Sequence, residues 1–92
     1  MDHPIPVLDH SKNGGEALKT FDIFLEHTSH AGMLANITNR YPFTIALRQG
    51  RYVVDGKSLL GICSLEHSKP IVLEAYTDQV EGLANDIRPL IR

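Results

Sequence analysis

Two histidines, His27 and His30, stand three residues apart in the segment FLEHTSHAGML. A neutral imidazole nitrogen is a competent nucleophile near pH 7 and is also a common metal ligand. Side chains three residues apart on a helix lie on one face, so the two rings could act on the same group. The pair is therefore a candidate phosphoryl acceptor or a candidate metal site, and the alternative is two ordinary solvated side chains.

A metal site would need at least a third ligand beside the two histidines. Glu26 does not easily point in the same direction as the two rings. The remaining histidines, His3, His10 and His67, are not at ligand spacing. The sequence therefore predicts no metal site and no cofactor.

The chain has 92 residues, which is enough for one compact domain and too few for two. Its net charge is -2, and no cluster of Lys and Arg could neutralise several phosphates, so nucleic acid is not an expected partner. The longest apolar run is far shorter than a membrane span, so we expect no membrane insertion. The first residues lack a basic start followed by an apolar core, and Cys63 is the single cysteine, so we expect a cytoplasmic protein without an internal disulfide.

Residues 1–15 contain two prolines, two glycines and little periodicity. We expect a flexible leader there and one domain over residues 16–92. Within the domain, the hydrophobic pattern predicts strands over 17–25, 43–49, 51–54 and 71–76. It predicts helices over 28–40 and 80–91, and a short helix over 58–65. The dipeptide Gln49-Gly50 is typical of a hairpin turn between the second and third strands.

Polar residues at the helix starts indicate which side chains cap them. Thr28 or Ser29 can cap the first helix, and Ser58 is the expected N-cap of the short helix. Before the last helix, Asp78 and Glu81 are spaced like a capping box, with Thr77 as a competing cap. Pro89 falls in the final turn of that helix, where its lost hydrogen bond matters least.

The element order is therefore β-α-β-β-α-β-α. The short hairpin makes the middle strands antiparallel, and the three helices must cover a four-stranded sheet. Helices placed on one face of an open antiparallel sheet give an α+β fold of two layers. The opposite face of the sheet is then expected to be at least partly wet.

The segment DGKSLLGICSL, residues 55–65, resembles the regulatory-serine helix of the histidine-containing phosphocarrier protein (HPr) family of the bacterial sugar phosphotransferase system. The order of the elements is also that family's order. Counting back from Ser58 at the family's spacing reaches His27 without a gap, at the start of the first helix. The resemblance runs from Phe21 to Ile91, and it implies the HPr-like open-faced β-sandwich.

The resemblance implies a phosphoryl carrier rather than a stand-alone enzyme. His27 would accept phosphate from phosphoenolpyruvate through Enzyme I and pass it to an Enzyme IIA-type protein. The backbone N–H groups of Ser29 and His30, at the positive end of the helix, would point toward that phosphate. In some bacteria an ATP-dependent kinase phosphorylates the serine that matches Ser58, whereas the structural alternative is that Ser58 only caps its helix.

The family docks its partners on the first helix and the serine helix. The resemblance therefore implies that Leu59, Leu60 and Cys63 contact partners, and the alternative is that the apolar residues of this helix pack on the sheet, which we prefer for Ile62. We expect a monomer or a weak dimer.

The histidine segment departs from the family pattern Gly-Leu-His-x-Arg-Pro-Ala. Ser29 replaces an arginine that would steady the transferring charge, and Glu26 adds a negative charge beside the acceptor. His30 replaces the proline, and in its protonated form it could supply part of the lost positive charge. The alternative function is therefore a degenerate HPr-fold module that binds proteins without phosphoryl transfer. A small-molecule-binding regulatory domain would need a glycine-rich ligand loop, which the sequence lacks.

If Glu26 opposes transfer and the missing arginine limits it, the double variant Glu26→Leu with Ser29→Arg should transfer phosphate faster than the natural sequence, because it removes a repelling charge and adds a stabilising one. The measurement is the rate of labelling from phosphoenolpyruvate through Enzyme I. An unchanged rate would indicate that the site is not built for transfer.

Overall fold

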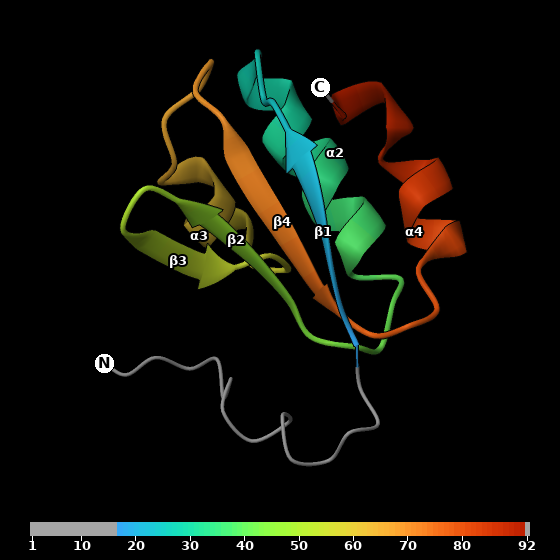
Figure 1. Ribbon diagram of the computed structural model, residues 1–92. Helices are drawn as coiled ribbons and strands as arrows, with labels where there is room; N and C mark the ends of the chain where they lie inside the picture. Colours follow the sequence, from blue (N-terminus) through green and yellow to red (C-terminus); the bar gives the residue numbers. More distant parts are fainter. Residues whose placement is uncertain (1–16, 92) are drawn as a thin grey trace.

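The computed structural model describes residues 17–91, so the leader expected over residues 1–15 lies outside the described residues. The elements follow the expected order β-α-β-β-α-β-α, and a short 3₁₀ helix, η1, comes after the last α-helix (Figure 1). Their bounds are β1 (Leu18–Ile23), α2 (Thr28–Thr38), β2 (Ile45–Gln49), β3 (Tyr52–Asp55), α3 (Leu59–Cys63), β4 (Ile71–Tyr76), α4 (Glu81–Asp86) and η1 (Arg88–Leu90).

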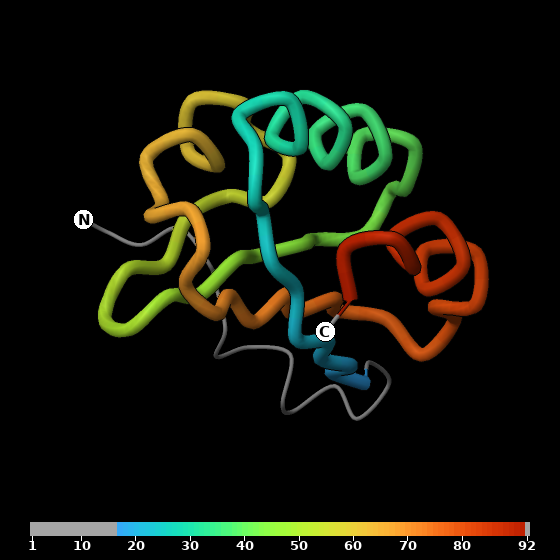
Figure 2. The backbone as a smooth tube through the Cα atoms, turned by 90° about the horizontal axis from the view of Figure 1, so that it is seen from above, coloured from blue at the N-terminus to red at the C-terminus, as the bar shows by residue number. Residues whose placement is uncertain are grey.

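The four strands form one antiparallel sheet in the order β1-β4-β2-β3. Figure 2 shows the sheet nearly edge-on, with α2, α3 and α4 on the same side of it. The expected α+β fold, with an open four-stranded antiparallel sheet and three α-helices, is therefore confirmed at this level. No helix within residues 17–91 has both the length and the apolar character that a membrane crossing requires.

The core lies between the inner face of the sheet and the helices. Alternate residues of each strand point to this side, as the period of a strand requires. Burial of each large aliphatic side chain contributes about 1.5–3 kcal/mol, so this layer is the main source of stability. The strands supply Ile23, Ile45, Leu47, Ile71, Leu73 and Ala75, and the helices supply Leu34, Ile62, Leu83, Ile87 and Leu90, all at most 2% exposed.

The outer face of the sheet carries an ion pair at its centre. Arg48 Nε on β2 donates a hydrogen bond of 2.9 Å to Glu74 Oε2 on β4, and this bond raises the pKa of the Arg48 guanidinium. Glu74 is only 8% exposed, so the pairing compensates the cost of removing its carboxylate from water. Thr20 and Asp22, on the same face, are exposed, which agrees with the expectation of a partly wet face.

The turn between β3 and α3 is tied to two other elements at Gly56. The Gly56 N–H donates to the Ile45 carbonyl at 2.8 Å, and the buried Thr38 hydroxyl donates to the Gly56 carbonyl at 2.7 Å. One residue further on, Asn39 Nδ2 donates to the Lys57 carbonyl at 2.9 Å. These bonds fix the start of α3 beside the C-terminal end of α2.

The hairpin lies one residue later than expected. Gln49 pairs with Tyr52, so the two-residue turn is Gly50-Arg51 rather than Gln49-Gly50, and Gly50 has a positive φ of 61°. The pairing places Leu47 opposite Val54 on the inner face of the sheet. Two-residue hairpin turns favour glycine at the first central position, and this register places Gly50 there.

The last helix is shorter than the predicted range of 80–91. It ends at Asp86, and the chain continues as η1, which contains Pro89. Pro89 therefore lies in η1 and not in the final turn of the α-helix, and it lacks the N–H that would continue the α-helical pattern. After η1, Ile91 forms an antiparallel bridge to Ile23 at the edge of the sheet.

The expectation of a capping box at the start of α4 was also wrong. The N-cap is Val80, which has no side-chain capping bond. The Thr77 hydroxyl instead accepts the Gln79 N–H at 3.0 Å. A local turn thus uses the side chain that the sequence suggested as a competing cap.

The tie at Gly56 predicts that Gly56→Ala destabilises the fold by about 1–3 kcal/mol, the usual cost of overpacking. A Cβ at this position would lie 2.7 Å from Ile45 Cγ2 and 2.9 Å from the Ile45 carbonyl oxygen. The measurement is the free energy of unfolding in urea.

The matched control is Gly32→Ala in the middle of α2, where a Cβ has no heavy atom within 4 Å. That variant should gain about 0.5–1 kcal/mol from the higher helix propensity of alanine. Equal stability of the two variants would contradict the importance of the close approach at Gly56.

Candidate functional site

His27 lies at the N-cap of α2, the first of the helices that cover the sheet. Its backbone is extended, with φ of -131° and ψ of 154°, and its side chain makes no capping hydrogen bond. The expected caps, Thr28 and Ser29, are instead the first two residues of the helix. The His27 ring is exposed and is not used to hold the helix start, so it is available for chemistry at the positive end of α2.

His30, in the first turn of α2, bonds to the segment before the helix through both backbone and ring. Its N–H donates to the His27 carbonyl at 2.9 Å, and its Nδ1 accepts the Glu26 N–H at 3.2 Å. The rings of His27 and His30 meet edge to face, with centroids 5.3 Å apart and planes at 74°. The structure thus brings the two histidines together as the spacing predicts.

The backbone N–H of His30, a predicted phosphate contact, already has a hydrogen-bond partner in the His27 carbonyl. A phosphate on His27 would share this N–H with the His27 carbonyl or displace that bond. The N–H of Ser29, at the second position of the helix, points along the same end of α2. A role for the N–H groups of Ser29 and His30 in phosphate binding stays a prediction.

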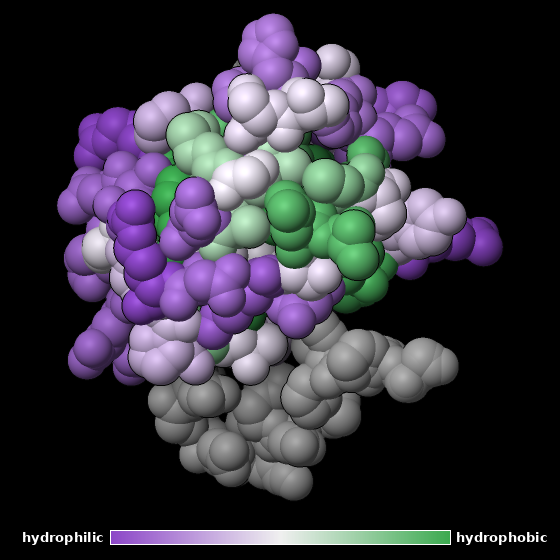
Figure 3. All heavy atoms as spheres, turned by 180° about the vertical axis from the view of Figure 1, so that it is seen from behind, coloured by the Kyte–Doolittle hydropathy of each residue, from purple (hydrophilic) through white to green (hydrophobic). Residues whose placement is uncertain are grey.

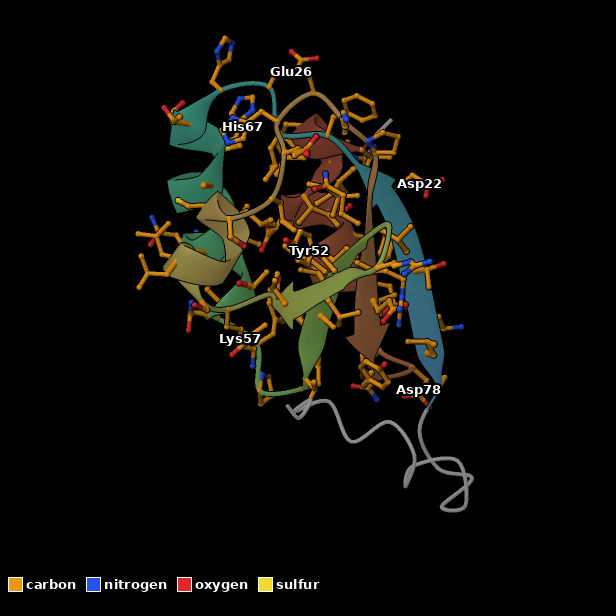
Figure 4. The ribbon with its side chains drawn as sticks, turned by 90° about the vertical axis from the view of Figure 1, so that its left-hand side faces the viewer. Asp22, Glu26, Tyr52, Lys57, His67 and Asp78 are labelled. Atoms are coloured by element: carbon orange, nitrogen blue, oxygen red, sulfur yellow. The ribbon has the colours of Figure 1, made fainter. Side chains whose placement is uncertain are left out.

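The segment that carries His27 is held from two sides. The Phe24 N–H donates to the Leu90 carbonyl of η1 at 2.9 Å, and the Ser68 N–H donates to the Leu25 carbonyl at 3.2 Å. Ser68 has a positive φ of 68°, so the loop before β4 adopts a sparsely populated conformation where it contacts this segment. The loop also brings His67, which is half-buried, to the same end of the molecule as Glu26 (Figure 4).

From the sequence, His67 was excluded as a metal ligand because it is not at ligand spacing from His27 and His30. Only the return of the loop before β4 to Leu25 brings the two regions together, and no local pattern indicates that return. Within residues 17–91, however, no group of three or more His, Cys, Asp or Glu side chains has the arrangement of a metal site.

Ser58 is the N-cap of α3, as the sequence predicts. Its hydroxyl oxygen accepts the Gly61 N–H at 3.1 Å, and the residue is half-buried. The capping bond satisfies one of the N–H groups that have no partner inside the helix. Capping is therefore an observed role of this serine.

The two candidate phosphorylation positions are far apart. Glu26, next to His27, lies at one end of the molecule, and Lys57, next to Ser58, lies toward the other end (Figure 4). The start of α3 is tied to the C-terminal end of α2, whereas His27 begins that helix. The 11 residues of α2 span about 16 Å, which sets the separation of the two positions.

An apolar surface lies on α3 between these two positions. Leu60 is 82% exposed, Leu59 is 49% exposed and Cys63 is also exposed, and we call these three residues the α3 patch. Ile62, by contrast, is fully buried against the sheet, as preferred from the sequence. Figure 3 shows the helix side of the molecule, where apolar side chains gather over the part that carries α3.

No family model matches the chain, and neither a curated protein nor a solved structure shows a significant match to it. Its resemblance to a known family therefore depends on the motifs, the spacing and the element order described above.

The capping bond predicts that Ser58→Ala lowers the free energy of unfolding by about 1 kcal/mol. Ser58→Asn is the matched control, because an asparagine side chain can accept the Gly61 N–H in the same way and should keep most of the stability. Urea unfolding of both variants provides the measurement. Equal losses in both would show that the hydroxyl contributes through something other than the cap.

Proposed function

We propose that this chain is an HPr-like phosphocarrier, or a regulatory paralogue of one, in the phosphoenolpyruvate-dependent sugar phosphotransferase system. The observation that carries the proposal is the position of His27, an exposed imidazole at the N-terminus of α2 whose ring caps nothing. The sheet order and the HPr-like motif at Ser58 are compatible with it. The proposal implies a cytoplasmic protein whose partners are Enzyme I and an Enzyme IIA-type protein.

The chemistry requires only one nucleophilic nitrogen and a place for the charge. An unprotonated nitrogen of His27 supplies the electron pair that forms the N–P bond, while the bond between phosphorus and its donor on Enzyme I breaks. Onward transfer to an Enzyme IIA-type protein reverses the roles, with His27 as the leaving group. The partial positive charge at the start of α2 favours the phosphate while it is carried.

The position of Ser58, directly before the α3 patch, supports a regulatory role. A phosphate on its hydroxyl would add charge at the start of α3, directly before Leu59 and Leu60 of the α3 patch. A docked partner that covers this patch would have to bury or pair that charge. A serine kinase is therefore the third proposed partner, and its product would dock differently from the unmodified protein.

The second candidate function is a protein-binding module on the same fold, without phosphoryl transfer. Two features favour it: Glu26 places a carboxylate beside His27, and Ser29 takes the place of the arginine that would stabilise the transferring group. The α3 patch would serve such a module equally well, because docking on apolar residues needs no phosphate.

Labelling from phosphoenolpyruvate in the presence of Enzyme I tests the proposal. The natural chain should acquire an acid-labile phosphate, and His27→Ala should lose it completely while its circular dichroism spectrum stays native. The matched control is His67→Ala, another histidine at this end of the molecule, which should keep the label (Figure 4). Label that persists in His27→Ala would refute the assignment.

A second incubation, with ATP and a serine kinase of the phosphotransferase system, separates the remaining outcomes. Acid-stable phosphate that disappears in Ser58→Ala would support the regulatory paralogue. Absence of label from both incubations would favour the protein-binding module.

A further inference from the structure

The bond between Glu26 and His30 replaces the missing cap of α2. In a capping box, the third residue of the helix accepts the backbone N–H of the N-cap residue. Here the third helical residue, His30, accepts instead the N–H of Glu26, the residue before the N-cap, at 3.2 Å. Because His27 provides no side-chain cap, this bond joins the helix to the segment that carries the candidate acceptor.

The bond needs His30 in one protonation state. An imidazole nitrogen accepts a hydrogen bond only while it carries no proton, so the proton of the neutral ring must be on Nε2. A second proton would be added at Nδ1, where the ring would then present an N–H to the N–H of Glu26. Protonation of His30 therefore breaks the bond.

We propose that His30 is a positioning residue whose neutral ring holds the Glu26-His27 backbone against α2, and that protonation of this ring releases the backbone. The proposal rests on the proposed function for its relevance to phosphoryl transfer, but the bond itself is independent of that function. His30 thereby makes the geometry of the His27 site depend on pH.

This role excludes the one that the sequence suggested for His30. As a substitute for the family's arginine, His30 would have to be protonated, and it would then lose the bond to Glu26. A neutral His30 with its proton on Nε2 still presents that N–H as a donor. The ring thus contributes either the position of the segment or a positive charge, and not both at once.

Other ionisable groups come from the elements around this end of α2. On the same segment they are the carboxylate of Glu26 and the ring of His27. The loop that bonds to Leu25 contributes His67 and Glu66, and Glu66 pairs with Lys69 at 2.8 Å. The end of α3 contributes Cys63, and η1, which bonds to Phe24, contributes Arg88. His27 and His67 are the other two imidazoles among these groups, so a test has to separate the three rings.

The test is nuclear magnetic resonance of the ¹⁵N-labelled full chain between pH 5 and 8. Ring nitrogen shifts should identify the Nε2–H tautomer of neutral His30. Protonation of His30 should shift the Glu26 amide signal and should speed its hydrogen exchange about three- to tenfold beyond the intrinsic pH dependence, which is the effect expected from the loss of one hydrogen bond.

Two variants of His30 and one of His67 separate the sources of the effect. His30→Asn keeps an acceptor near the position of Nδ1 but cannot titrate, so its Glu26 amide should be protected at every pH in this range. His30→Ala should leave that amide unprotected throughout. His67→Asn should retain the pH dependence of the natural chain.

The proposal is overturned if neutral His30 carries its proton on Nδ1, or if the Glu26 amide titrates in His30→Asn as it does in the natural chain. Labelling rates then extend the result to function. His30→Ala should accept phosphate more slowly than His30→Asn, and equal rates would overturn the effect on His27. If the natural chain accepts no phosphate, the proposed function fails while the resonance measurements still decide whether His30 holds the segment.

Discussion

The inner face of β4 is the feature on which the other elements depend. β4 is a central strand that pairs with both β1 and β2, and its inward side chains, Ile71, Leu73 and Ala75, are completely buried. Each neighbouring strand must therefore keep a register that turns its own apolar side chains to the same face. The helices then cover that face, and this packing places the ends of α2 and α3, where the candidate residues lie.

Hydrogen bonds at the two ends of α2 hold the candidate residues in place relative to the core. At the C-terminal end of α2, Thr38 and Gly56 hold the turn that leads to Ser58. At the opposite end, the segment before His27 is held by backbone bonds from Phe24 and Ser68. Both ties use polar groups that meet only after the chain has folded, so the two candidate positions are products of the tertiary structure.

Much of the fold could be predicted from alternation of apolar residues, because alternation reports directly which side chains are buried. The range of β4 follows from this alternation, and the cap at Ser58 follows from the preference for serine at helix starts. The N-cap of α2 could not be predicted, since preferences for serine and threonine pointed to Thr28 and Ser29, whereas the backbone turns at His27. The approach of the loop that carries His67 has no signature in the sequence, because it depends on where that loop returns. The bond from Glu26 to His30 is local, but it follows from the N-cap at His27, which the sequence did not indicate.

The length of α2 has an electrostatic consequence. Its span of about 16 Å exceeds the Debye length of about 8 Å at physiological ionic strength. A charge added at one end of this helix is therefore largely screened from the other end along any path through solvent. Groups at His27 and Ser58 would behave as nearly independent charges in the isolated chain. Any communication between them would have to arise in a complex, where a partner that covers the α3 patch excludes the ions that screen one from the other.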